Sequence, residues 1–283
     1  MKEHPIFRTA WWGTNVLLAA AVISLIFAAG WEYSVRRYLK GFSDAIVPEA
    51  AAPEQKVEAI LEWMRHGPSR NSSEHSDELA ARDPQNTLNY RELLEVCGTA
   101  TNAFLNLGKS GGLQVRRLLL LGPNRATKHV VAEVLIGDRW VVVDPMFRTM
   151  LRDPQGQLLT RQQLRAPGVL EQATRDIPDY SSEYDYNNVA HIRLARIPLM
   201  GLGLRRVLDR MYSGWDEAFD WSLILERESF AMLFASFLAT VFLLIGRLGL
   251  AWYADRRLHI PRLRLRTQIL RARAALFSSP ELK

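Results

Sequence analysis

The amino-acid sequence predicts an α+β domain flanked by two transmembrane helices. The domain is predicted by an amphipathic helix that begins at Cys97 and by two β-rich segments, 129–136 and 139–143, separated by a short turn. The transmembrane helices are predicted by two uncharged apolar runs, 9–31 and 229–246. We expect the Cys97 helix to pack into the core on an antiparallel sheet.

The first apolar run is long enough to cross a membrane. Its 23 residues, 9–31, carry no charge, and at 1.5 Å per helical residue they exceed the hydrocarbon core of about 30 Å. Aromatic residues lie at both ends of the run, as in the interfacial belts of membrane proteins. A cleaved signal peptide is the alternative. We favour an uncleaved anchor, because segment 28–30 leads into aromatic residues and not into a clear cleavage site.

Between this run and Cys97 the sequence predicts a linker, a helix and a loop. Segment 48–53 is alanine-rich and bounded by prolines, which is typical of a linker. Segment 54–66 is predicted to be an amphipathic helix. Segment 67–89 is rich in Ser, Asn, Asp and Glu and is predicted to be a mobile loop that could rim a cleft. The apolar face of the helix consists of Val57, Ile60, Leu61 and Met64.

The next helix is predicted to start at Cys97, the only cysteine among the 283 residues. Small and apolar residues recur after it at three- and four-residue intervals, and Gly108 follows as a natural helix stop. The partial positive charge of a helix N-terminus favours thiolate over thiol, so this position lowers the pKa of a cysteine. The recurring residues are Ala100, Ala103, Phe104 and Leu107.

Segments 129–136 and 139–143 are predicted to pair as a β-hairpin. Both are rich in β-branched and aromatic residues. Gly137 and Asp138 between them fit a two-residue hairpin turn. The turn determines which residues face one another.

In that register, two residues with acid–base chemistry become neighbours. If Ile136 faces Arg139, then Val131 faces Asp144. His129 and Asp144 are then diagonal neighbours on one face, roughly 7–8 Å apart at Cα. The carboxylate can therefore accept a hydrogen bond from the imidazole.

Cys97, His129 and Asp144 together predict acyl-transfer chemistry. A thiol is an effective nucleophile when a base takes its proton, and the base works best when a third group orients it. We expect a thiolate–imidazolium pair. Each residue also has a structural interpretation, since a lone cysteine is most often a small buried side chain and a histidine at a strand start is often a hydrogen-bonded core residue. The joint pattern favours catalysis over a degenerate or purely structural domain.

The same stretch resembles the transglutaminase-like superfamily, a branch of the papain-like thiol enzymes. The pattern of that superfamily is a Cys at a helix start, a Gly-x-x-x-Arg stretch, a His that opens a strand and an Asp-Pro that closes the next. Here we identify Val96-Cys97, 112–116, His129 and Asp144-Pro145. The resemblance covers residues 55–150. It implies a papain-like core with Cys97 as nucleophile, His129 as general base and acid, and Asp144 as the orienting residue.

Two positions near these motifs are interpreted separately. Glu95 stands where the superfamily commonly has a small residue, often Gly, so the shape of the substrate cleft beside Cys97 is expected to differ. Arg116 is expected to be a structural ion-pair residue and not a catalytic one. Glu133 is the nearest alternative carboxylate on the face of His129.

Three local patterns follow the hairpin. Segment 153–156, Asp-Pro-Gln-Gly, is predicted to be a turn. Thr160 is predicted to cap a short helix that ends at Leu164. The tyrosine-rich segment 180–186 either lines the cleft or a surface, or has a packing role.

The second apolar run and its flank predict the membrane topology. Segment 229–246 is short for a span, but Arg247 could snorkel to the interface while residues 248–253 complete the crossing. A buried core helix is the alternative. Segment 247–283 carries nine Lys or Arg against two acidic residues, a net charge of +7 that exceeds the +6 of the whole chain. A basic flank of this kind is typical of the cytoplasmic side.

We therefore divide the chain into four parts. They are an N-terminal tail with a transmembrane helix (1–40), an extracytoplasmic domain (41–227), a second transmembrane helix (228–253) and a basic cytoplasmic tail (254–283). Because the basic charge belongs to the tail, it argues for contact with anionic lipid and against nucleic acid. One unpaired thiol outside the cytoplasm is a liability unless it has a function.

The sequence therefore predicts a bacterial-type enzyme of the cytoplasmic membrane. We expect a cysteine-dependent hydrolase or acyltransferase that acts on peptide or amide bonds. No metal-binding or nucleotide-binding motif is present, so no cofactor is expected. The expected partners are a peptide or protein substrate, membrane lipids and a possible membrane complex. The alternative is a non-catalytic module of the same fold that binds peptide or glycan beside such a complex.

Overall fold

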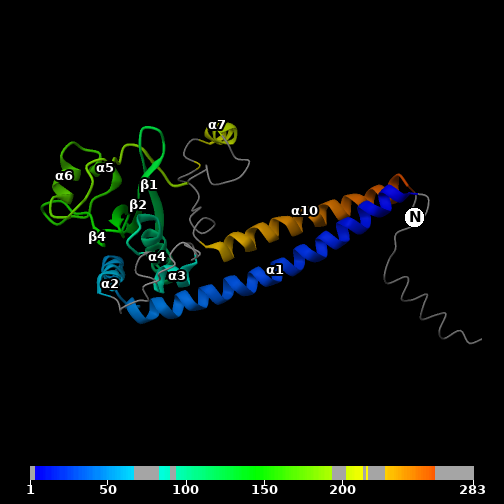
Figure 1. Ribbon diagram of the computed structural model, residues 1–283, viewed down its shortest axis with the longest axis horizontal. Helices are drawn as coiled ribbons and strands as arrows, with labels where there is room; N and C mark the ends of the chain where they lie inside the picture. The colour runs from blue at the N-terminus through cyan, green and yellow to red at the C-terminus, as the bar shows by residue number, and fades with distance from the viewer. Residues whose placement is uncertain are drawn as a thin grey trace, which may run out of the picture. The chain divides into compact units, whose positions relative to one another are not determined.

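The computed structural model describes residues 4–66, 83–89, 94–192, 202–212, 215 and 227–258 (Figure 1). The chain divides into two compact units. One unit consists of Met1–Ala28 and Met232–Lys283, and the other is Ala29–Ala231. The α+β domain lies in the second unit.

Helix α1 (Pro5–Ile46) is longer than the apolar run that predicted it. After that run, Val35 and Leu39 are buried in the main core of the second unit. The charged residues around them, Arg36, Arg37 and Lys40, are exposed. The boundary that we expected at residue 40 therefore falls inside a helix, because an amphipathic stripe continues the helix after the uncharged run has ended.

The segment after α1 confirms one expectation and corrects another. Helix α2 (Pro53–His66) buries the four residues predicted to form its apolar face. The loop expected over 67–89 was wrong at its end, because Pro84–Asn89 forms helix α3. The backbone N–H of Gln85 donates to Asp83 Oδ1 at 2.9 Å, so Asp83 caps a helix that opens with proline. Residues 67–82 lie outside the described residues.

Helix α4 (Cys97–Ser110) begins at Cys97 as predicted but does not stop at Gly108. A Cβ on Gly108 would come within 3.2 Å of Val115 Cγ1, so this glycine allows the helix to pack closely on the first strand. The chain leaves the helix later, at Gly112, which adopts a left-handed φ of +81°. Gly108 lies about one turn before the helix end, and in sequence a packing glycine resembles a capping glycine.

The strands of the described residues form one antiparallel sheet in the order β4-β3-β2-β1-β5. This sheet and its helices confirm the predicted α+β class. The strands are β1 (Val115–Leu121), β2 (Thr127–Ile136), β3 (Arg139–Asp144), β4 (Thr149–Met150) and β5 (Val189–Ala190).

The β2–β3 hairpin has the predicted register. Ile136 pairs with Arg139, and the ladder continues to Ala132 opposite Val143. Gly137 has a φ of +65°, which suits the first central position of a type II′ hairpin turn. The pairing of the two strands therefore follows from the turn, as expected.

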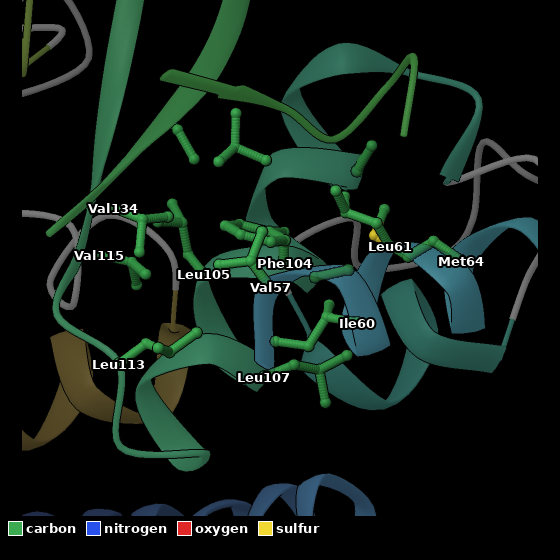
Figure 2. Close-up of a cluster of buried hydrophobic side chains, with 14 of the residues drawn as sticks. Val57, Ile60, Leu61, Met64, Phe104, Leu105, Leu107, Leu113, Val115 and Val134 are labelled. Atoms are coloured by element: carbon green, nitrogen blue, oxygen red, sulfur yellow. The ribbon is translucent and has the colours of Figure 1, made fainter. Parts of the chain in front are cut away.

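Helices α2 and α4 cover one face of the sheet. Figure 2 shows Val57 and Ile60 of α2 and Phe104 of α4 in one apolar cluster with Val115 and Val134 of the sheet. The side chains of this cluster are almost fully buried. Burial of each such side chain contributes about 1.5–3 kcal/mol, so this layer holds α4 against the sheet.

A second, smaller cluster covers the opposite face of the sheet. Val131 and Val142 pack there against α5 (Arg161–Leu164), α6 (Val169–Thr174) and Tyr186. The predicted cap of α5 is confirmed, since Thr160 and Gln163 form a capping box. The predicted turn at 153–156 is also confirmed by a hydrogen bond from Gly156 N to Asp153 O of 2.9 Å.

Two described helices are long and apolar enough to cross a membrane, α1 and α10 (Glu228–Arg256). Along the chain, the amphipathic helix α7 (Leu202–Met211) follows the last strand and precedes α10. Only 11% of the most apolar window of α1, and of α10, is buried, so neither window is a core helix of the described structure. In the first unit, Arg247 Nε donates to Asn15 Oδ1 at 2.7 Å, and its guanidinium lies 5.1 Å from the Trp11 ring centroid.

Candidate active site

Cys97 is the first residue of α4 and is partly exposed. The residue before it, Val96, is extended and offers no side-chain cap to the helix. The start of the helix is fastened to β2, because Thr101 Oγ1 donates to Val130 O at 2.9 Å. This bond holds the Cys97 end of the helix next to the residue that follows His129.

His129 and Asp144 form a buried pair. His129 Nε2 lies 2.7 Å from Asp144 Oδ2, and the two side chains are 1% and 0% exposed. The other carboxylate oxygen, Oδ1, accepts the backbone N–H groups of Met146 at 3.2 Å and Phe147 at 3.3 Å. Both oxygens of Asp144 therefore have partners, so the carboxylate has a defined position from which to orient the ring.

The remaining ring nitrogen of His129 is Nδ1. Nδ1 is buried and has no hydrogen-bond partner of ordinary geometry among the described residues. It is thus the nitrogen left to exchange a proton with the Cys97 thiol, which interacts with the ring. Contacts between a nucleophile and its base are often loose without substrate and tighten when substrate binds.

The pKa values of Cys97 and His129 are both shifted so that the charged form of each group is favoured. Burial acts to raise the pKa of the Cys97 thiol, but the His129 ring and backbone hydrogen bonds from Val130 and Gly98 lower that pKa below its usual value. Burial acts to lower the pKa of His129, but Asp144 and Cys97 raise it to about 9. At a pH between the pKa of Cys97 and the pKa of His129, the thiolate–imidazolium pair is favoured.

Three aromatic rings surround His129, and we call them the aromatic cage: Phe147, Tyr180 and Tyr184. Tyr184 stacks on the imidazole with centroids 4.2 Å apart and planes 6° apart. Phe147 and Tyr180 meet the ring edge to face, at 5.9 Å and 6.3 Å. A stacked π face favours a cation, and the rings exclude water from the bond to Asp144.

The phenol groups of the cage segment form a polar link beside Asp144. The hydroxyls of Tyr180 and Tyr186 lie 3.0 Å apart. Burial, and then the neighbouring Tyr186 and Asp144, raise the pKa of Tyr180 well above its usual range. The phenol therefore stays protonated around neutral pH and can donate a hydrogen bond.

The segment that carries the two tyrosines of the cage is attached to the β1–β2 end of the sheet. Lys128 Nζ lies 3.0 Å from Glu183 Oε2. Asn188 Nδ2 donates to Gly122 O at 3.0 Å, and Leu121 N donates to Asn188 O at 2.8 Å. The exposed ion pair contributes little, so the two hydrogen bonds and the packing of the rings hold the segment over His129.

The structure brings together Cys97, His129 and Asp144, the three residues that the sequence singled out. Glu133, the alternative carboxylate, pairs with Arg116 and not with His129. Glu133 Oε2 accepts Arg116 Nε at 2.8 Å, so Arg116 is the ion-pair residue that we expected. The cage was missed as a feature of the site. The sequence signal for the cage was the density of tyrosines in 180–186. That signal fitted a role in lining the cleft or a surface and a role in packing equally well. The described residues contain no group of three or more His, Cys, Asp or Glu side chains that could hold a metal.

Comparison with known families identifies the domain. Residues 40–145 match the transglutaminase-like superfamily. The chain carries a transglutaminase-like domain. The match includes Cys97, His129 and Asp144, and it begins within α1, which agrees with the burial of the end of α1 in the domain core. No curated protein and no solved structure matches the chain.

The transglutaminase-like match ends just after β3. The superfamily consists typically of cysteine-dependent enzymes. The aromatic cage lies C-terminal to the matched residues, since Phe147, Tyr180 and Tyr184 follow residue 145. The environment of His129 is therefore built partly by segments outside the part of the chain that matches the superfamily.

Proposed function

We propose that this transglutaminase-like domain is a cysteine-dependent acyl-transfer enzyme that acts on peptide or amide bonds. The observation that carries the proposal is the buried bond of 2.7 Å between His129 and Asp144, next to a cysteine at a helix N-terminus whose pKa is lowered. A core histidine without a catalytic role needs no thiol beside it. A buried cysteine without a role is inert and has a raised pKa.

The first half of the reaction forms a thioester. The Cys97 thiolate attacks the carbonyl carbon, and a C–S bond forms while the carbonyl oxygen becomes an oxyanion. The imidazolium of His129 then gives its proton to the leaving amine as the C–N bond breaks. Asp144 keeps its hydrogen bond to Nε2 throughout and stabilises the charged ring.

The second half releases the acyl group. Water or an amine attacks the thioester carbon, and the neutral His129 takes its proton. The C–S bond breaks, which restores the Cys97 thiolate and the imidazolium. We favour water as the acceptor, because the described residues around Cys97 offer no dedicated site for an amine.

The start of α4 is the proposed source of the oxyanion hole. The first turn of a helix has backbone N–H groups without an intrahelical partner, and Val96 offers them no side-chain cap. Gly98, within this turn, is one of the groups that lower the pKa of the thiol. N–H groups that favour a thiolate also favour the oxyanion that forms beside it.

We also propose that the enzyme is anchored in the cytoplasmic membrane by α1 and α10, with the domain outside the cytoplasm. The exposed apolar surface of both helices supports membrane insertion, because in water such a surface costs roughly 25 cal/mol per Å². The net charge of +7 in segment 247–283 supports a cytoplasmic C-terminus. A reporter fused after Lys283 should behave as cytoplasmic, and one inserted at 67–82 as external. If the inserted reporter is cytoplasmic, the orientation is wrong.

Thiol labelling tests the chemistry without knowledge of the substrate. In membranes at about pH 6, iodoacetamide should alkylate Cys97 at least tenfold faster than it alkylates the same protein after denaturation, where the thiol has its ordinary pKa. His129→Ala should remove this difference and leave ordinary labelling at pH 9. Equal labelling of the native and denatured protein at pH 6 would contradict the proposed ion pair.

A non-catalytic module is the second candidate. It is favoured by one observation, the nearly complete burial of His129, whose Nδ1 has no hydrogen-bond partner among the described residues. Such a module would bind peptide or glycan with equal affinity in wild type and in Cys97→Ala. Labelled thiol at pH 6 together with turnover of a peptide library that is lost in Cys97→Ala would exclude it.

A further inference from the structure

Helix α7 presents apolar side chains to solvent. Val207 and Met211 lie one turn apart and are therefore neighbours on the helix surface, where they are 51% and 78% exposed. Tyr212, directly after the helix, is 59% exposed. None of the described side chains of α7 belongs to an apolar cluster of the described structure. The apolar face of α7 is therefore uncovered.

Helix α2 shows how the domain treats another amphipathic helix. Its apolar face, formed by Val57, Ile60, Leu61 and Met64, is at most 2% exposed because it packs into the core. Helix α7 separates apolar from polar residues more strongly than α2 does. An amphipathic helix whose apolar face stays in water is typical of a helix that lies at a membrane surface.

The polar side of α7 is basic. Arg206 and Arg210 are exposed, and neither makes an ion pair with a described residue. The ten residues of the helix include three arginines and one acidic residue, a net charge of +2. At 3.6 residues per turn, the two arginines lie about 100° around the helix axis from Val207 and Met211. This arrangement lets apolar side chains enter a bilayer while the guanidinium groups stay at the level of the phosphates.

The place of α7 in the chain favours a membrane surface over a protein partner. Sixteen residues separate Met211, the end of α7, from Glu228, the start of α10. Such a segment spans at most about 60 Å when fully extended. If α10 crosses the membrane as proposed above, α7 is always held near a bilayer surface, so its effective concentration there is high. Anionic headgroups also match the charge of the two exposed arginines.

We propose that α7 lies on the membrane surface, with Val207 and Met211 inserted below the headgroups and Arg206 and Arg210 bound to anionic lipid. The proposal rests on the membrane anchoring proposed above, but not on the orientation of the domain or on the chemistry at Cys97. Helix α7 thereby gives the domain a third attachment to the bilayer. Unlike a span, this attachment responds to the charge of the lipid.

Site-specific fluorescence tests the proposal, since Cys97 is the single cysteine of the chain. In full-length Cys97→Ala with Val207→Cys, the new thiol carries an environment-sensitive fluorophore. The protein is placed in nanodiscs of phosphatidylcholine, with or without phosphatidylglycerol, that contain lipids with a quencher on the acyl chain. Quenching should be at least about threefold stronger with phosphatidylglycerol, because the anionic lipid holds the apolar face in the bilayer.

Charge variants test the role of the arginines. Arg206→Gln with Arg210→Gln should lower the quenching in anionic nanodiscs to the level in phosphatidylcholine alone, since each arginine changes the ratio of bound to free helix by roughly fivefold. Arg139→Gln with Arg175→Gln removes the same charge from exposed positions outside α7 and should leave the quenching unchanged. Equal quenching with and without phosphatidylglycerol, or an equal loss in both double variants, would overturn the proposal.

A second label position separates this proposal from the anchoring on which it rests. Phe242, 76% exposed on α10, lies in the proposed span, so a fluorophore at Phe242→Cys should be quenched in both lipid mixtures. An unquenched label there would overturn the anchoring and the proposal with it. A quenched label at Phe242→Cys and an unquenched one at Val207→Cys would overturn the proposal alone. A Val207→Cys label that is shielded from water but not reached by the lipid quencher would assign the face to a protein partner instead.

Discussion

Strand β2 contributes one residue to each of two acid–base pairs, His129 and Glu133, and the two pairs differ in what covers them. At one end His129 bonds to Asp144 under the aromatic cage, and both side chains are almost fully buried. At the other end Glu133 bonds to Arg116, and the guanidinium borders an open pocket. The distances are alike, 2.7 Å and 2.8 Å. The two pairs therefore differ in cover and not in the length of the bond.

The physical reason is the exclusion of water. Under the cage the charge of His129 has no solvent to stabilise it, so neighbouring groups shift its pKa. At the pocket, the guanidinium of Arg116 borders open space, where water screens its charge. The same sheet therefore presents a titratable pair and a permanent charge.

The largest expected effect separates the two pairs. His129→Ala should reduce turnover by about 10⁴-fold because it removes the base, and Cys97→Ala with His129→Ala should be no worse than either change alone. Glu133→Gln, the matched change at the other pair, should leave turnover within about threefold when the protein is folded. Steady-state kinetics with a peptide substrate, together with circular dichroism, measure both. Equal losses in the two variants would remove the distinction.

Asp144→Asn should have the next largest effect. The amide cannot stabilise the imidazolium as the carboxylate does, yet Cys97 and His129 remain, so turnover should exceed that of Cys97→Ala by roughly a hundredfold. The alkylation of Cys97 at pH 6 should fall in parallel. Wild-type turnover in Asp144→Asn would show that His129 takes its orientation from another group.

A change of register tests how the hairpin builds the first pair. One residue inserted between Gly137 and Asp138 should shift Asp144 relative to His129 or force a bulge, since a slip by one residue reverses the faces. Turnover should fall toward that of Asp144→Asn while the protein stays folded. The control is an insertion between Gln155 and Gly156, in a turn that carries no proposed catalytic residue, and it should be nearly neutral. Full activity of the first insertion would contradict the role of the register.

The smallest effect concerns the cage. Tyr184→Leu keeps the ring covered but removes the π face that favours imidazolium, so the pKa of His129 should fall from its raised value of about 9. The alkaline limb of the pH–rate profile should move to lower pH by about half a unit, which corresponds to the roughly 0.5–1 kcal/mol of a cation–π contact. Tyr184→Phe should keep the wild-type profile, and so should Trp140→Leu in the other region. A shift in Trp140→Leu would show that the effect is not local.

Several features of the domain could be predicted from the sequence because they are local. A two-residue turn and a period of two determine which residues of β2 and β3 face one another, so the His129–Asp144 pair followed from counting. A period of 3.6 determined which face of α2 is buried. Helix α3 was also encoded locally, by Asp83 and Pro84, but the polar composition of the surrounding segment favoured a loop.

The remaining features were decided by contacts between residues far apart in the chain. Tyr184 reaches His129 because segment 180–186 folds back over the end of β2, and nothing within either segment specifies that approach. Gly108 could be recognised as a packing glycine only once β1 lay against α4. The pocket exists because the start of α5 lies beside Arg116 and Trp140. Periodicity and turn chemistry act within one element or one hairpin, so the sequence determined the pairing of His129 with Asp144. The cover over that pair depends on how separate elements pack, and only the tertiary structure decided it.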